Sequence, residues 1–107
     1  MKTLKLKFLS DSQHGWLSVK LADIKTLGIA ADISHYSYIR GKSAYLEEDQ
    51  DAGIFLNAAR SAGWQVTYTE SYSDKQSPIR SYARYVYVTP EKEFFNSHII
   101  FQHIGDN

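Results

Sequence analysis

Four acidic side chains lie close together near the middle of the chain, at a spacing that could support chemistry. They are Glu47, Glu48, Asp49 and Asp51. Carboxylates grouped in this way can bind a metal ion or act as a general acid and base. The segment does not fit the calcium-loop pattern D-x-[DN]-x-[DN]-G, because its fifth position is Gly53 and its twelfth is Arg60. The sequence therefore predicts no calcium loop here.

The same acids are also typical of the start of a helix. Apolar residues recur at helical spacing through residues 49–62, and Gly63 follows where a left-handed end residue is favoured. We predict that Asp49 caps this helix by accepting a backbone N–H, which contributes about 0.5–2 kcal/mol. Asp51 then lies in the first turn, where the helix dipole favours a negative charge by a few tenths to about 1 kcal/mol. On this interpretation the acidic cluster is structural and not catalytic.

A second candidate site consists of aromatic and basic residues in two separate parts of the chain. It comprises Tyr36, Tyr38, Arg40, Lys42, Arg80, Tyr82 and Arg84. Tyrosine, tryptophan and arginine anchor protein–protein interfaces, so these residues predict a surface that binds another protein. The same residue types on a sheet also hold single-stranded nucleic acid by stacking. A third interpretation is structural, with arginine stems lying over tyrosine rings in an aromatic core.

The four histidines give the third candidate chemistry. His98 and His103 are five residues apart, which places them together on neither a helix face nor a strand face. His14 or His35 could act as a base with a nearby carboxylate, and a small hydrolase or transferase is the corresponding hypothesis. The chain has no G-x-S-x-G, H-E-x-x-H, G-x-G-x-x-G or G-x-x-x-x-G-K-[ST] motif. We therefore predict no metal, no cofactor and no catalytic residue.

The elements that must position these residues follow from hydrophobic periodicity. The pattern predicts an α+β fold with a mainly antiparallel sheet packed against one main helix. The predicted strands are residues 3–9, 35–40, 43–47, 64–72 and 81–88, the main helix is 49–62, and a short helix covers 20–27. A further short extended segment is indicated by Trp16, Leu17 and Val19. Residues 94–104 fit either a helix or a strand.

Three of these segments carry more detailed expectations. Residues 3–9 place Lys5 and Lys7 on one face, which suits an edge strand. Residues 64–72 alternate, which predicts one buried aromatic face that includes Tyr68 and Tyr72. Residues 81–88 are partly apolar on both faces, which predicts a central strand.

Length and composition favour an ordinary globular domain. A chain of 107 residues with 43% hydrophobic and 22% charged residues is typical of one folded domain. Twelve basic and twelve acidic residues give no net charge, which disfavours a dedicated duplex-DNA binder. The absence of cysteine and of a signal peptide favours the cytoplasm, and no apolar run is long enough for a membrane span.

Four short sequence segments together resemble those of one protein family. They are HGWLSV (14–19), LGIAADISHYSY (27–38), AYLEEDQDAGIFL (44–56) and PIRSYARYVY (78–87). They resemble a family of small proteins carried by phages, plasmids and other mobile elements. The resemblance implies an intracellular accessory protein that binds a host or phage protein and antagonises a host defence system. It implies no active-site residue. A homodimer could form through an edge strand such as 3–9 or through the tyrosine-rich hairpin.

Overall fold

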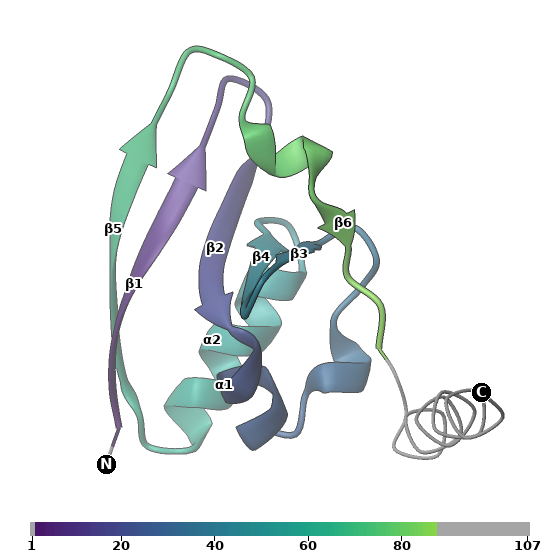
Figure 1. Cartoon of the computed structure of the whole chain (residues 1–107). Coiled ribbons are helices and arrows are strands. Elements are labelled where there is room, and N and C mark those ends of the chain that lie inside the picture. The colour runs from purple at the N-terminus through teal and green to yellow at the C-terminus, as the bar shows by residue number, and fades with distance from the viewer. Residues whose placement is uncertain (1, 88–107) are drawn as a thin grey trace, which may run out of the picture.

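The computed structural model describes residues 2–87 and forms a six-stranded sheet with one main helix (Figure 1). The elements are β1 (Thr3–Ser10), β2 (Gly15–Lys20), α1 (Leu21–Thr26), η1 (Ala30–Asp32), β3 (Tyr38–Arg40), β4 (Ser43–Glu47), α2 (Asp51–Ser61), β5 (Gln65–Tyr72), η2 (Pro78–Ser81) and β6 (Ala83–Arg84). The strand order is β5-β1-β2-β4-β3-β6. The β1–β5 pair is parallel and the other pairs are antiparallel. The predicted α+β fold, with a mostly antiparallel sheet, is confirmed.

The main hydrophobic core lies between the sheet and α2. The largest fully buried side chains of this core include Phe55 on α2, Leu17 on β2 and Leu46 on β4. Ile24 brings the short helix α1 onto the same core, and Tyr85 reaches it from the segment after β6. Alternation along the strands places these apolar residues on one face, so we call it the helix face and call the opposite side the open face.

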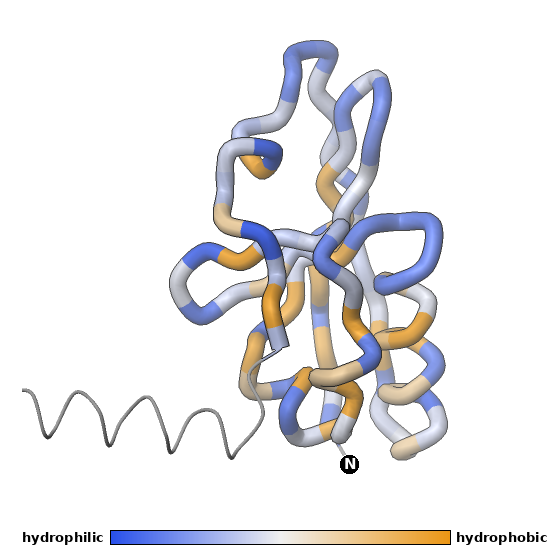
Figure 2. Tube along the Cα trace, turned by 90° about the vertical axis from the view of Figure 1, so that its right-hand side faces the viewer, coloured by the Kyte–Doolittle hydropathy of each residue, from blue (hydrophilic) through white to orange (hydrophobic). Residues whose placement is uncertain are grey.

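A second, smaller apolar cluster lies on the open face. It forms where residues 73–84, here called the crossing segment, pass over the sheet. Ile79 of η2 packs on Trp16 and Tyr38, with Tyr45 and Tyr82 at its margin. Figure 2 shows the long helix and the crossing segment on opposite sides of the sheet, with hydrophilic loops gathered at the end remote from the core.

Several predicted positions differ from the structure. The segment 81–88 was expected as a central strand, but it begins with the end of η2 and then forms the two-residue edge strand β6. Residue 88 itself lies outside the described residues, as does the segment 94–104. Strand 35–40 is shorter than expected, since β3 covers Tyr38–Arg40. The short extended piece at Trp16 is the full strand β2, paired with both β1 and β4.

The predicted edge position of residues 3–9 and the predicted burial of residues 64–72 are both wrong. β1 lies inside the sheet between β5 and β2, so its lysines do not mark an edge. β5 is the edge strand, and the predicted burial of its aromatic face is wrong. Tyr68 is 45% exposed and Tyr72 is 63% exposed. Among residues 2–87, no helix has the length and apolar character needed to cross a bilayer.

Candidate functional site

The acidic cluster starts α2, but through different residues from those predicted. The helix begins at Asp51 after Gln50, and no side chain of the cap residue accepts a hydrogen bond. The prediction that Asp49 caps the helix is therefore wrong. The carboxylate of Glu47 accepts the backbone N–H groups of Asp49, Gln50 and Asp51 at 2.8–3.0 Å. A residue at the end of β4 thus performs the capping role that the sequence assigned to Asp49.

Asp51 lies in the first turn as predicted, and it also has a second role. Its side chain is fully buried. Its Oδ2 atom accepts hydrogen bonds from the backbone and hydroxyl of Ser34 and from the hydroxyl of Ser37. A buried carboxylate requires such donors, because burial without them costs several kcal/mol. Asp51 therefore fixes the loop before β3 to the helix.

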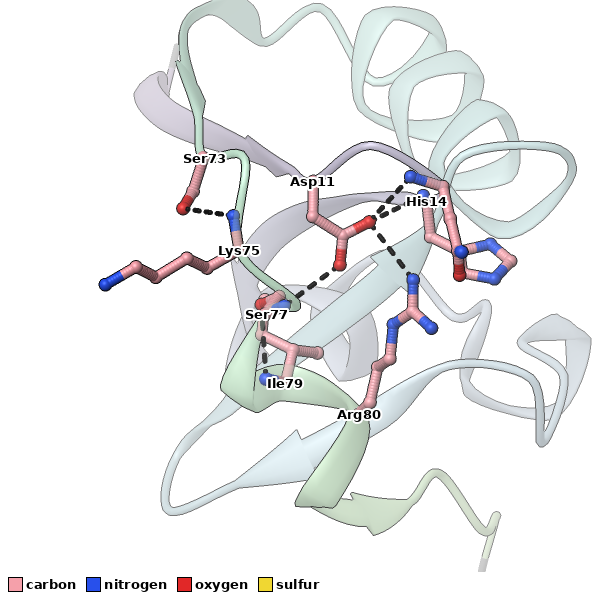
Figure 3. Close-up of polar contacts among 8 residues, drawn as sticks. Asp11, His14, Ser73, Lys75, Ser77, Ile79 and Arg80 are labelled. Carbon is pink, nitrogen blue, oxygen red and sulfur yellow. Dashed lines mark hydrogen bonds and ion pairs between the residues drawn. The ribbon is translucent and has the colours of Figure 1, made fainter.

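Asp11, in the turn between β1 and β2, accepts four hydrogen bonds that connect this turn to the crossing segment (Figure 3). Its Oδ1 atom accepts the backbone N–H groups of Gln13 and His14 and the Arg80 guanidinium, at 2.9, 2.9 and 3.1 Å. Its Oδ2 atom accepts the backbone N–H of Ser77 at 2.9 Å. These donors, led by the Ser77 amide, hold the pKa of the Asp11 carboxyl well below its usual range, against the opposing effect of burial. Asp11 therefore fastens the crossing segment to the β1–β2 turn.

The crossing segment brings part of the predicted tyrosine–arginine surface together beside β3. Arg84 lies over the Tyr38 ring at 4.6 Å, and Arg40 lies over the Tyr82 ring at 4.8 Å. The antiparallel pairing of β3 with β6 makes these two cation–π contacts neighbours on one side of the sheet, and Tyr38 itself is buried. Arg80 is engaged by Asp11. Tyr36 is 62% exposed, and Lys42 is exposed in the β3–β4 turn.

An open cleft of about 640 Å³ collects part of this surface. Its lining includes aromatic residues, two arginines, a histidine and acidic residues from the β4–α2 connection. Residues of the predicted set that line it are Tyr36, Tyr38, Arg80 and Arg84. Arg40, Lys42 and Tyr82 do not belong to its lining. Glu47, Glu48 and Asp49 add acidic groups to a lining that also contains the two arginines.

The two candidate histidines have different surroundings. The exposed His14 lines the cleft, where its ring lies 6.0 Å from that of Trp16. His35 is exposed and stacks on Tyr36 with ring centroids 4.5 Å apart. Within residues 2–87, the hydrogen bonds include none between an imidazole and a carboxylate, and no group of three or more acids and histidines could hold a metal ion. His98 and His103 lie outside the described residues.

The open face carries a surface that the sequence analysis missed. One register row crosses all six strands, and directly paired residues project on the same side of a sheet. The row consists of Thr69, Lys7, Ser18, Tyr45, Tyr38 and Arg84. In the adjacent row Lys20 and Arg40 both pair with Ser43, and Lys5 pairs with Thr67. We call Lys5, Lys7, Lys20, Arg40 and Arg84 the basic face.

All five cations of the basic face are exposed. Because side chains alternate along a strand, the described strand residues on this face include one acid, Glu47. Its carboxylate already accepts hydrogen bonds from the backbone amides of residues 49–51. Exposed hydroxyls of Thr67 and Thr69 lie beside the lysines. The signal available in the sequence was the alternation of lysine with leucine in β1, but assembling the face required the strand order.

Searches of protein-family models, of curated proteins and of solved structures gave no match to the chain.

Proposed function

We propose that the protein is a non-enzymatic binding protein that holds a single-stranded nucleic acid on its open face. The observation that carries this proposal is charge segregation in a chain whose net charge is zero. Five exposed cations lie together on the basic face, while acids such as Asp51 and Glu47 are engaged in holding the fold. Phosphate groups would meet lysine and arginine side chains there, and neutralising them supplies affinity through counterion release.

The aromatic residues support a single strand over a duplex. The guanidinium groups of Arg40 and Arg84 lie over tyrosine rings, and guanidinium groups can also stack on unpaired bases. Unpaired bases expose their faces, whereas a duplex keeps them stacked inside. Threonine and serine hydroxyls between the cations provide further donors to phosphate oxygens. This arrangement favours binding of modest sequence preference.

The test is a salt titration with a fluorescently labelled oligo(dT) strand. Five phosphate contacts predict that log K falls against log salt with a slope of about −3 to −4. Replacing Lys7 and Lys20 by glutamine should reduce the slope by about 1.4, since each single-strand contact contributes about 0.7. The double variant Lys25→Gln, Arg60→Gln is the matched control. It removes the same charge from exposed positions on α1 and α2.

Two results would refute this function. One is no anisotropy change for the wild-type protein at low salt. The other is an equal loss of affinity in both double variants, which would show a response to net charge and not to the basic face.

The cleft favours a second candidate, in which the partner is a protein. Its aromatic lining and walls of both charges suit a peptide segment better than a phosphate chain, because Glu48 and Asp49 would repel phosphates. In keeping with the family resemblance, the partner would be a host or phage protein, such as a component of a defence system. Tyr36→Ala should then weaken capture of the partner from nuclease-treated host lysate, while Lys7→Gln should not. Capture that disappears on nuclease treatment would exclude this candidate.

A further inference from the structure

The two edges of the sheet differ greatly in length and protection. β6 contributes two residues, whereas β5 presents eight residues, Gln65–Tyr72, along the opposite edge (Figure 1). Natural edge strands are usually blocked by lysine, proline, a bulge or a covering segment. β5 contains no lysine, arginine or proline, and its pairing to β1 runs without interruption from Thr3↔Gln65 to Ser10↔Tyr72. Among residues 2–87, no strand pairs with its outer side.

The direction of the backbone groups along β5 follows from its contacts with β1. Gln65 donates its N–H to Lys2 at 2.9 Å, and Ser73 donates to Ser10 at 3.0 Å. In a parallel pair, alternate residues direct both their N–H and C=O groups to the same neighbour. The odd-numbered residues of β5 therefore pair with β1. Val66, Tyr68, Glu70 and Tyr72 direct their backbone groups outward.

We infer that this edge pairs with β5 of a second copy of the chain, antiparallel, across a two-fold axis at Thr69. In that register Val66 lies opposite Tyr72 of the second copy, and Tyr68 lies opposite Glu70. Every outward N–H and C=O group of these four residues then finds a partner. A two-fold axis perpendicular to the sheet is required, because only that operation keeps paired side chains on one face.

The charges near the edge fit a second copy of the same chain. Glu70 lies opposite a tyrosine and not opposite the other Glu70, so like charges are not paired directly. Lys7 is one strand inside the edge. It is separated from Lys7 of the second copy by three strand spacings, or about 14 Å, which exceeds the screening length of about 8 Å at physiological salt. The dimer also joins the two open faces into one continuous surface, so the inference extends the proposed function without depending on it.

Disulfide trapping tests the register, because the chain has no native cysteine. Thr69 and its copy form a non-hydrogen-bonded pair, with Cα atoms about 4.5 Å apart, which is within the range of a disulfide. Thr67 is the matched control. It is also exposed and has the same side chain, but it lies about 13 Å from its own copy along the paired strands. Under mild oxidation, Thr69→Cys should form the linked dimer at least tenfold faster than Thr67→Cys.

Sedimentation of the wild-type chain without nucleic acid gives an independent test. The average mass should rise with concentration from 12.2 kDa towards twice that value. Glu70→Pro removes an outward N–H but no hydrogen bond to β1, so it should stay monomeric with an unchanged circular dichroism spectrum.

A wild-type monomer at all concentrations, or equal cross-linking of the two cysteine variants, would overturn the inference. If Glu70→Pro fails to fold, Tyr68→Lys replaces it, because an edge lysine should also block pairing. Neither readout involves nucleic acid, so failure of the dimer leaves the proposed function to its own test.

Discussion

The helix face and the open face of the sheet are held by different interactions. On the helix face, Phe55, Leu17 and Ile24 are almost completely buried and the contacts are mainly apolar. On the open face, a small aromatic cluster is kept in place by the hydrogen bonds of one carboxylate, Asp11. Apolar burial is strong and non-directional, whereas a carboxylate network depends on geometry and on pH. The comparison indicates that the helix face contributes most of the global stability, whereas the crossing segment on the open face can detach locally.

The largest expected effect is on the helix face. Phe55→Ala removes a fully buried ring from the centre of α2, and such truncations cost about 3–5 kcal/mol because they leave a cavity. A small domain has about 5–15 kcal/mol of total stability, so the variant should unfold at a much lower urea concentration. Urea denaturation followed by circular dichroism measures this. Global stability close to that of the wild type would show that the core is not concentrated under α2.

The second effect is the loss of the Asp11 network on the open face. Asp11→Asn keeps the size of the side chain but removes the charge that four donors stabilise. The crossing segment should detach locally while the helix face stays folded. Amide hydrogen exchange should speed up at Tyr82, whose N–H donates to Ile79, with little change inside α2. Equal acceleration in α2 would show that the two faces unfold as one unit.

The same carboxylate predicts a pH dependence with a definite sign. Its pKa is lower in the folded state than the ordinary value of about 3.9. The unfolded chain therefore binds more protons in the interval between the two pKa values. The stabilisation is present above about pH 4 and is lost as the pH falls towards the folded-state pKa. Thermal unfolding between pH 6 and pH 2.5 should show a smaller decline in Asp11→Asn than in the wild type. Asp74→Asn, which alters an exposed carboxylate of the crossing segment, should retain the wild-type decline.

A third and smaller effect concerns the polar contact between Tyr85, which directly follows the crossing segment, and η1. The Tyr85 hydroxyl donates to the Ala30 carbonyl at 2.6 Å, and burial, with the nearby charge of Asp51, raises the pKa of that hydroxyl. Tyr85→Phe removes the hydrogen bond and keeps the ring, at a cost of about 0.5–1.5 kcal/mol. The urea midpoint should fall slightly with an unchanged slope. A change in slope would indicate that the hydroxyl also determines how compact the folded state is.

The sequence predicts the helix face better than the open face, for a physical reason. The period of residues 49–62 predicted α2 within two residues at its start, and the alternation of residues 43–47 predicted β4. Both are local patterns. The position of β5 at an edge depends on its pairing with β1, more than fifty residues earlier in the chain, and local alternation contains no information about pairing.

The errors around the crossing segment have a similar cause. Residues 81–88 have the composition of a strand. However, Asp11 binds the Ser77 amide and the Arg80 side chain, and Pro78–Ser81 between and around these contacts forms a helical turn. The strand that follows is therefore short. The Asp49 prediction failed because the carboxylate of Glu47, at the end of β4, accepts the amides of residues 49–51. The basic face draws cations from β1, β2, β3 and β6, so it exists only in the assembled sheet.

The smallest expected effect on stability comes from Lys7→Gln, which should change binding on the open face without changing the fold. Lys7→Gln changes an exposed side chain in the middle of the open face, where Lys7 pairs with Ser18 and Thr69. Exposed substitutions away from caps and networks usually alter stability by less than about 0.5 kcal/mol. The urea midpoint should therefore match the wild type, while the affinity for oligo(dT) falls and the salt slope decreases by about 0.7. Phe55→Ala should behave in the opposite way, keeping the wild-type salt slope at any temperature where it is still folded. If Lys7→Gln destabilised the chain as much as Tyr85→Phe, the lysines would be needed for the fold, and their gathering on one face would no longer support a binding role.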